Sequence, residues 1–259
     1  MGEALREFFG FGGYQRQPEG AYSWQHLTFV GSMILVMIVL AILLGLRNRH
    51  RPDKVRNRVI IVSAILIDAF EIAKIVIVGI KDPGNLLNVL PLFTCSISLF
   101  ALPLAAFAKG RIREASLDFM FIFGLLLAVF GTIGAAQNYS AYPVLAWDNV
   151  VSGITHSISG FSSLYIGVSG MMSMKKKNIW ITFLILFIFS AAAYVADVLI
   201  PYNYMFLMRG DGTPYDIFYN LVNGNRVLYP SIVVGLFVLW MVIFYAVYYL
   251  ITKKKASRD

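Results

Sequence analysis

The residues best able to do chemistry in this chain are one cysteine and one histidine, each set in an apolar stretch. Cys95 lies in the run VLPLFTCSISLF and is the only cysteine among the 259 residues. His156 lies in the run VVSGITHSISGF. A thiol becomes a nucleophile when a neighbouring base takes its proton, and histidine can act as that base. The pair could therefore form a covalent intermediate if the fold brings the two side chains together.

The alternative interpretation is that Cys95 packs between helices. Free cysteine is among the most frequently buried residues and behaves as a small hydrophobic side chain. Apolar surroundings also oppose formation of the thiolate. A single cysteine cannot form an internal disulfide, and the three histidines are too far apart in sequence for a metal cluster. We therefore expect neither a metal nor a cofactor.

The histidine belongs to a polar stripe on one helical face. The stripe recurs at steps of four, three and four residues, which keeps its members on one side of a helix: Ser152, His156, Ser159 and Ser163. Three glycines recur every seven residues in the same segment and would allow close helix packing: Gly153, Gly160 and Gly167. Serines alone would indicate hydrogen bonds between helices. The histidine adds the possibility of proton chemistry, because its pKa lies near neutrality.

Three ionisable residues interrupt another apolar run. Asp68, Glu71 and Lys74 are spaced by three, so neighbours share a helical face. Glu71 and Lys74 could form a local ion pair that lowers the cost of membrane insertion and implies no chemistry. Ionisable residues inside membrane spans are nevertheless usually functional. Both interpretations stay open on the sequence alone.

The composition is that of an all-α polytopic membrane protein. Hydrophobic residues make up 58 % of the chain and charged residues only 14 %, whereas a soluble domain carries about 25 % charged residues. The net charge of +8 lies between apolar runs, which argues against nucleic acid as a partner. We expect residues 1–259 to form a single domain of seven transmembrane helices, near 27–46, 59–80, 89–108, 117–136, 149–172, 179–200 and 230–252.

The charges between these spans predict an orientation. Four alternate connecting segments hold 16 of the 22 Lys and Arg residues, and the other connecting segments and the N-terminus hold five. Positive charge marks the cytoplasmic side. We therefore expect the N-terminus outside, the C-terminus in the cytoplasm, and a multi-pass protein of the cell membrane. The oligomeric state is not readable from the sequence.

In this topology the candidate residues fall at a common depth. Counting about 1.5 Å per residue places them in the outer third of the bilayer. We expect Cys95, His156 and Glu71 to be catalytic. The expected substrate-binding residues are His26, Lys74, Ser98, Ser159, Asp197 and Asn203.

Several short motifs together resemble the YwaF family of bacterial integral membrane proteins, which is related to the eukaryotic transmembrane protein 164 acyltransferases. They are WQHLTF with His26, the residue Glu71, LPLFTCSIS with Cys95, ITHSIS with His156, and NYMFL from Asn203. The resemblance implies transfer of acyl chains between phospholipids through Cys95 in the third span and His156 in the fifth. The family often has a histidine two residues before the cysteine, where this chain has Phe93.

The expected chemistry is attack of a Cys95 thiolate on a phospholipid ester. His156 would act as the base, with Glu71 or Asp197 orienting the imidazole. The thioester would pass its acyl chain to a lysolipid or to water. Candidate groups to stabilise the oxyanion are Thr94, Ser98, Ser159 and Lys74.

The alternative function is a small-solute or proton-coupled transporter. A pathway for protons or solute could use the intramembrane ionisable residues, namely Asp68, Glu71, Lys74 and His156. Pro91 and Pro103 could break the third span, as occurs at transporter sites. The two functions differ over Cys95, because only the acyltransferase needs the sulfur.

Overall fold

The structure is a computed structural model that describes residues 2–256, with side chains described up to residue 253. Helices are its only regular elements, and no strand occurs within the described range. The chain forms two compact units. One unit contains the residues up to Pro91 together with Cys95–Ser173, and the other contains Leu92–Thr94 together with the chain from Met174 onward.

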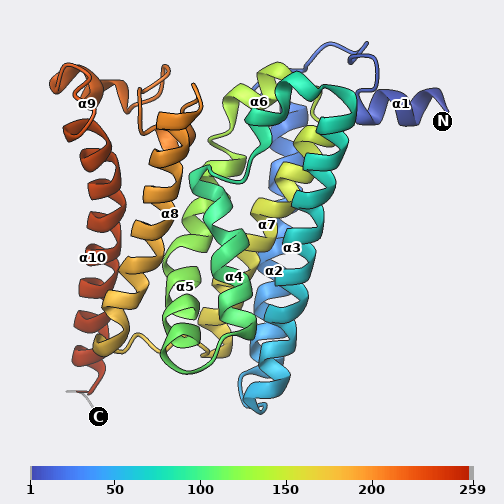
Figure 1. The fold of residues 1–259 in the computed structure, drawn as a ribbon. Coiled ribbons are helices and arrows are strands. Elements are labelled where there is room, and N and C mark those ends of the chain that lie inside the picture. Colours follow the sequence, from blue (N-terminus) through green and yellow to red (C-terminus); the bar gives the residue numbers. More distant parts are fainter. Residues whose placement is uncertain (1, 257–259) are drawn as a thin grey trace. The chain divides into compact units, whose positions relative to one another are not determined.

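Helix α7 is the centre of the first unit (Figure 1). It packs against the long helices α2, α3 and α5, and the shorter α4 packs against α3 and α5. The helices of this unit are α1 (Glu3–Phe9), α2 (Trp24–Asn48), α3 (Asp53–Lys81), α4 (Ser98–Phe107), α5 (Gly110–Thr132), α6 (Ala136–Ala141) and α7 (Trp147–Ser169).

Small residues let α7 approach its neighbours closely. A Cβ at Gly160 would lie 2.7 Å from the Cβ of Ala128 on α5, and one at Gly167 would lie 2.7 Å from Cε2 of Phe121. Such distances are below van der Waals contact, so both positions require glycine at this spacing. The packing role predicted for the glycines is confirmed at these two positions.

The predicted third span is not one continuous helix. A 3-10 helix η1 (Pro83–Val89) is followed by an irregular segment, a 3-10 turn η2 (Thr94–Ile97) and then α4. The two arms are bent by 68°. Pro91 supplies the physical reason, because a proline disfavours helical backbone at the residue before it, and Leu90 is extended with ψ of 138°. Pro103, by contrast, lies inside α4 without ending it.

The other six predicted spans each overlap one long helix, and four helical segments are long and apolar enough to cross a membrane. They are Trp24–Asn48, Gly110–Ala141, Lys176–Leu199 and Leu228–Lys253. The bent pair Pro83–Val89 and Thr94–Phe107 would make a fifth. The part of α3 in the predicted span 59–80 carries three ionisable residues and α7 is rich in serine, and neither helix is among these candidates. The chain is therefore a membrane protein with four or five such spans by composition, and the count of seven stays a prediction.

A buried ion pair fastens the N-terminal segment to the ends of α3 and α7. Lys81 pairs with Asp148 and donates a hydrogen bond to the carbonyl of Phe9 at 3.2 Å. The Tyr14 hydroxyl donates to the same carboxylate at 2.5 Å. Burial and the neighbouring Asp148 carboxylate raise the pKa of Tyr14, so this hydroxyl keeps its proton.

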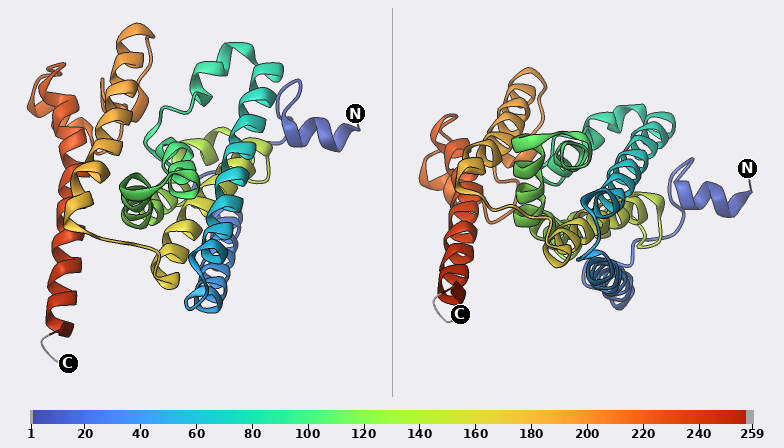
Figure 2. Two further views of the ribbon diagram at one scale, coloured as in Figure 1. Left: turned by 60° about the horizontal axis from the view of Figure 1, so that its bottom comes forward. Right: turned by 90° about the horizontal axis from the view of Figure 1, so that it is seen from below.

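The second unit is built around two long helices that lie side by side (Figure 2). The Tyr245 hydroxyl on α10 donates to Thr182 on α8 at 3.3 Å, and the Tyr249 hydroxyl donates to the carbonyl of Met174 at 2.6 Å. The elements are η3 (Lys176–Asn178), α8 (Ile179–Leu199), η4 (Tyr204–Phe206), α9 (Asp216–Leu221) and α10 (Leu228–Ala256).

Candidate functional site

Cys95 and His156 are brought together in the first unit. Cys95 lies in the turn η2 directly before α4, and His156 lies in the middle of α7. The thiol and the imidazole interact electrostatically, although Nε2 of His156 makes no hydrogen bond to any described residue. The break in the third span thus leaves the cysteine in a turn rather than within a regular helix.

Main-chain geometry fixes the tautomer of His156. Nδ1 lies 2.7 Å from the carbonyl oxygen of Ser152 and 3.3 Å from its hydroxyl. A carbonyl only accepts hydrogen bonds, so Nδ1 carries the hydrogen and the lone pair of the neutral ring is on Nε2. Nε2 is buried and makes no well-aligned hydrogen bond to any described residue. This nitrogen is therefore available to accept a proton.

The imidazole occupies space that only a glycine on α5 leaves open. A Cβ at Gly131 would overlap Cδ2 and Nε2 of His156. The ring is thus held by the Ser152 carbonyl at Nδ1 and by the main chain of α5 at its other edge. Neither contact was predicted from the sequence, because a backbone carbonyl and a missing side chain leave almost no signal there. A glycine within an apolar run indicates at most a close approach of some neighbour.

An ion pair on α3 flanks the cysteine. Nζ of Lys74 lies 2.5 Å from Oε1 of Glu71, so the predicted local pair is confirmed. Both side chains interact electrostatically with Cys95, and Lys74 also interacts with His156. The Lys74 ammonium favours a thiolate and the Glu71 carboxylate opposes it. Asp68, one turn away, interacts with Glu71.

Ser98 and Ser159 form a buried bridge beside this cluster. Their hydroxyl oxygens are 2.8 Å apart, and Ser159 donates to the carbonyl of Gly124 at 3.3 Å. Because the Ser159 hydrogen is used in that bond, Ser98 donates to Ser159. Ser163 donates to the carbonyl of Phe121 at 2.9 Å. This part of the polar stripe therefore joins α7 to α4 and α5.

Comparison with known proteins gives the chain a family. The model of the TMEM164 family matches residues 21–248. The chain belongs to the TMEM164 family. The relation to transmembrane protein 164 that the motifs predicted is thereby confirmed, whereas the YwaF assignment stays a prediction. No curated protein and no solved structure matches the chain.

His26 of this TMEM164-family chain has a different environment from His156. Its Nδ1 accepts a hydrogen bond from the backbone N–H of Tyr22 at 2.9 Å. The ring is fully buried and stacks on Tyr139, with ring centroids 3.8 Å apart. The lone pair is thus already engaged, the reverse of the arrangement at His156. The contacts of His26 tie the start of α2 to α6.

The remaining two candidates of the TMEM164-family chain, Asp197 and Asn203, lie in the second unit. Oδ1 of Asp197 accepts the backbone N–H of Tyr204 at 2.7 Å. The Asn203 amide donates to the carbonyl of Arg209 at 2.8 Å and to Asp211 at 2.7 Å. Both side chains therefore organise the loop after α8.

Phe93 belongs to the same unit as this loop. Its ring contacts those of Tyr204 and Tyr202, with centroids 5.3 and 6.0 Å away. The Phe93 ring thus has an aromatic packing role in the second unit.

Proposed function

We propose that this TMEM164-family protein is a membrane-embedded acyltransferase or acyl hydrolase that acts on phospholipid acyl chains through Cys95 and His156. One observation carries the proposal. Nε2 of His156 is buried and has its lone pair free because Nδ1 is bound to the Ser152 carbonyl, and the ring interacts with the Cys95 thiol. A nucleophile, a base and a group that orients the base make up the arrangement used in covalent acyl transfer.

The first half of the reaction forms a thioester. Nε2 takes the proton of the Cys95 thiol while the sulfur attacks the ester carbonyl carbon of a phospholipid. The carbon–oxygen bond of the ester then breaks, and His156 returns the proton to the oxygen of the departing lysolipid. The orienting group for the imidazole is the Ser152 carbonyl, in place of the carboxylates of Glu71 or Asp197 that the sequence suggested. The Lys74 ammonium favours negative charge at the sulfur and at the attacked ester.

The second half transfers the acyl group. A lysolipid hydroxyl or a water molecule loses a proton to Nε2 as its oxygen attacks the thioester carbonyl. The carbon–sulfur bond breaks, and the sulfur recovers a proton from His156. Transfer to a lysolipid gives an acyltransferase and transfer to water gives a hydrolase. The acceptor that reaches the thioester decides between the two.

We propose further that the chain spans the membrane seven times, with the N-terminus outside. Helices α3 and α7 have 29 and 23 residues, which exceeds the roughly 20 needed for a span. Many of their polar side chains are buried inside the first unit, among them Glu71, Ser159 and Ser163, as expected for polar groups within a membrane.

Cysteine labelling tests this topology. In a Cys95→Ser background, a cysteine introduced at exposed Ser140 should react with an impermeant reagent on intact cells, and one at exposed His50 should not. The reverse pattern would overturn the orientation. His50 is used for the position that should not react, and not Ser173 after α7. The N–H and the hydroxyl of Ser173 both donate to Asp118 at 2.7 Å, so a cysteine there would disturb the structure.

The catalytic proposal is tested with purified protein in liposomes that contain a labelled phospholipid. Cys95→Ser and His156→Ala should each abolish acyl release, with a loss of order 10²–10⁴ expected for a positioned base. His50→Ala is the matched control, because it removes an exposed histidine. Full activity in Cys95→Ser would show that the cysteine only packs. Absence of turnover in the wild type, together with solute uptake that Glu71→Gln blocks, would favour the transporter.

A further inference from the structure

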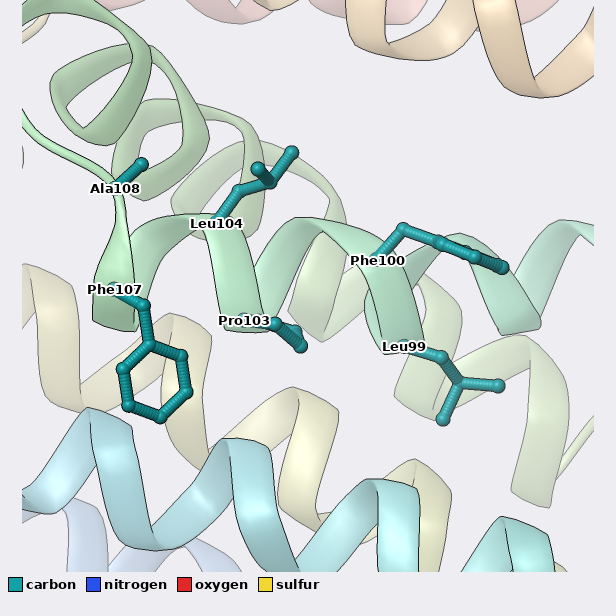
Figure 3. A pocket seen from close by; sticks show the side chains of 6 residues that line it. All are labelled: Leu99, Phe100, Pro103, Leu104, Phe107 and Ala108. Atoms are coloured by element: carbon teal, nitrogen blue, oxygen red, sulfur yellow. The ribbon is translucent and has the colours of Figure 1, made fainter.

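An apolar groove runs along one face of α4 (Figure 3). Its volume of about 530 Å³ lies within the range of small-molecule sites, about 300–1,000 Å³. None of the side chains that line it is polar or ionisable. The lining residues are Leu99, Phe100, Pro103, Leu104, Phe107 and Ala108.

The groove starts one helical turn after Cys95 along the chain. Leu99, at one end, comes four residues after Cys95, and Ala108, at the other end, comes nine residues after Leu99. At about 1.5 Å per helical residue the groove extends for roughly 14 Å. This is the length of roughly eleven extended methylene groups with C–C bonds of about 1.5 Å. A hydrocarbon chain attached to a carbonyl at Cys95 would therefore find a continuous apolar path along α4.

The shape of the groove suits a flexible chain better than a packed helix. Phe100 and Phe107 are bulky and exposed, with 50 % and 59 % of their surface accessible. The smaller Pro103 lies between the two phenylalanines along α4, and Ala108 follows Phe107. Helices that pack in membranes use small residues so that the backbones can approach, as Gly160 and Gly167 do on α7. Large side chains that stand apart instead leave an apolar hollow between them.

Polarity along the chain also favours this path. On α3, the face near Cys95 carries the ion pair of Glu71 and Lys74, which is unsuitable for a methylene chain. The ester carbonyl can face these charges while the acyl chain turns away from them along α4. We propose that the groove on α4 holds the acyl chain whose ester bond Cys95 attacks, and that the end of the groove at Ala108 sets the preferred chain length. This inference rests on the proposed function.

Chain-length selectivity is the first test. Ala108→Phe fills the far end of the groove. It should lower acyl release from phospholipids with sixteen-carbon acyl chains at least tenfold relative to those with eight-carbon chains, because an apolar pocket discriminates by about 10- to 200-fold per methylene group. Ala69→Phe, which adds the same bulk at an exposed position of α3, should leave the ratio unchanged. An unchanged ratio in Ala108→Phe, with turnover intact, would overturn the groove and leave the proposed function standing.

Photocrosslinking tests the groove without any chemistry at Cys95. The full-length Cys95→Ser protein is placed in phosphatidylcholine vesicles doped with a phosphatidylcholine that carries a diazirine near carbon 3 or near carbon 11 of one acyl chain. The first probe should crosslink at Leu99 and the second at Phe107 and Ala108. Ordered crosslinks without turnover in the wild type would support the groove and refute the catalytic proposal. Crosslinks spread evenly over exposed residues such as Leu43 and Ile65 would mean bulk lipid and would overturn the groove.

Discussion

The imidazole of His156 lies against the bare α-carbon of Gly131, in space that any larger residue on α5 would fill. The relationship joins two helices at the ring that interacts with Cys95. With the Ser152 carbonyl at Nδ1, it holds the ring from two sides. Gly131 is therefore a positioning residue for the proposed base, although it has no side chain to do chemistry.

Replacement of Gly131 by alanine should cost activity far more than stability. The added methyl group would displace the ring from its present position, and a misplacement of about 1 Å can lower a rate by about 10²-fold. The measurement is acyl release in liposomes, with thermal unfolding recorded alongside. Gly31→Ala on α2 is the control, because a Cβ there meets open space. Normal acyl release in Gly131→Ala would mean that the ring needs no such confinement.

The ion pair of Glu71 and Lys74 should respond to removal of one partner. Lys74→Met leaves the buried Glu71 carboxylate without its counter-charge, which costs about 3–5 kcal/mol at a buried site. The double variant Glu71→Gln with Lys74→Met should recover most of that loss. Unfolding in detergent micelles gives the stabilities. If the single variant is as stable as the double one, the pair contributes nothing to the fold.

The same double variant separates structure from catalysis. If the ion pair only stabilises the fold, acyl release by the double variant should be near the wild-type level. If Lys74 also stabilises the thiolate or the oxyanion, acyl release by the double variant should stay low. Acyl release is compared at a temperature where both proteins are folded.

The Ser98–Ser159 hydrogen bond should give a small and measurable coupling between α4 and α7. Hydrogen bonds between helices in membranes average about 0.6 kcal/mol and reach about 1.7 kcal/mol. A double-mutant cycle with Ser98→Ala and Ser159→Ala, read by unfolding, measures this coupling. Ser98→Ala combined with Ser32→Ala is the matched control, because Ser32 bonds to the carbonyl of Thr28 within α2. Equal coupling in the two cycles would contradict a direct bond.

Acid should loosen the N-terminal segment at Glu7. The carboxylate of Glu7 accepts the backbone N–H groups of Gln15 and Arg16, each at 3.1 Å, and these bonds lower its pKa below the usual 4.5. A lowered pKa in the folded state stabilises the segment above pH 4.5, and this stabilisation is lost as pH falls through the lowered value. Hydrogen-exchange protection at residues 15 and 16, corrected for intrinsic rates, should fall in that window. Glu7→Gln should remove the pH step, and Glu3→Gln should preserve it.

The helices were predictable because apolar runs of span length have one simple cause, the thickness of the bilayer. The segment around Pro91 was not, because the apolar composition of 89–108 fits a helix and a bent pair equally well. The extended backbone at Leu90 depends on one proline. Sequence spacing suggested that Cys95 and His156 share a depth, and the first unit does bring them together.

The finer chemistry of the site was beyond prediction for a physical reason. Every residue has a backbone carbonyl, so the role of the Ser152 carbonyl depends on its position in the fold and not on the residue type. Ser98 and Ser159 were recognised as polar residues, yet their mutual bond depends on rotamers that packing selects. Asp197 and Asn203 bind backbone groups within seven residues of themselves. From the sequence alone, polar residues that stabilise a loop cannot be distinguished from polar residues that bind a ligand.

The polarity of α7 has a consequence for how the protein is made. This helix is rich in serine, carries His156, and is not among the segments that are apolar enough to enter a membrane by themselves. In the proposed seven-span topology, α7 would enter the membrane together with apolar partners such as α2 and α5, which it contacts in the finished fold. The polar residues that weaken its insertion include His156 and the serines beside it. Under this proposal, assembly of the site and completion of membrane insertion coincide, and a chain that stops before α7 carries Cys95 without His156.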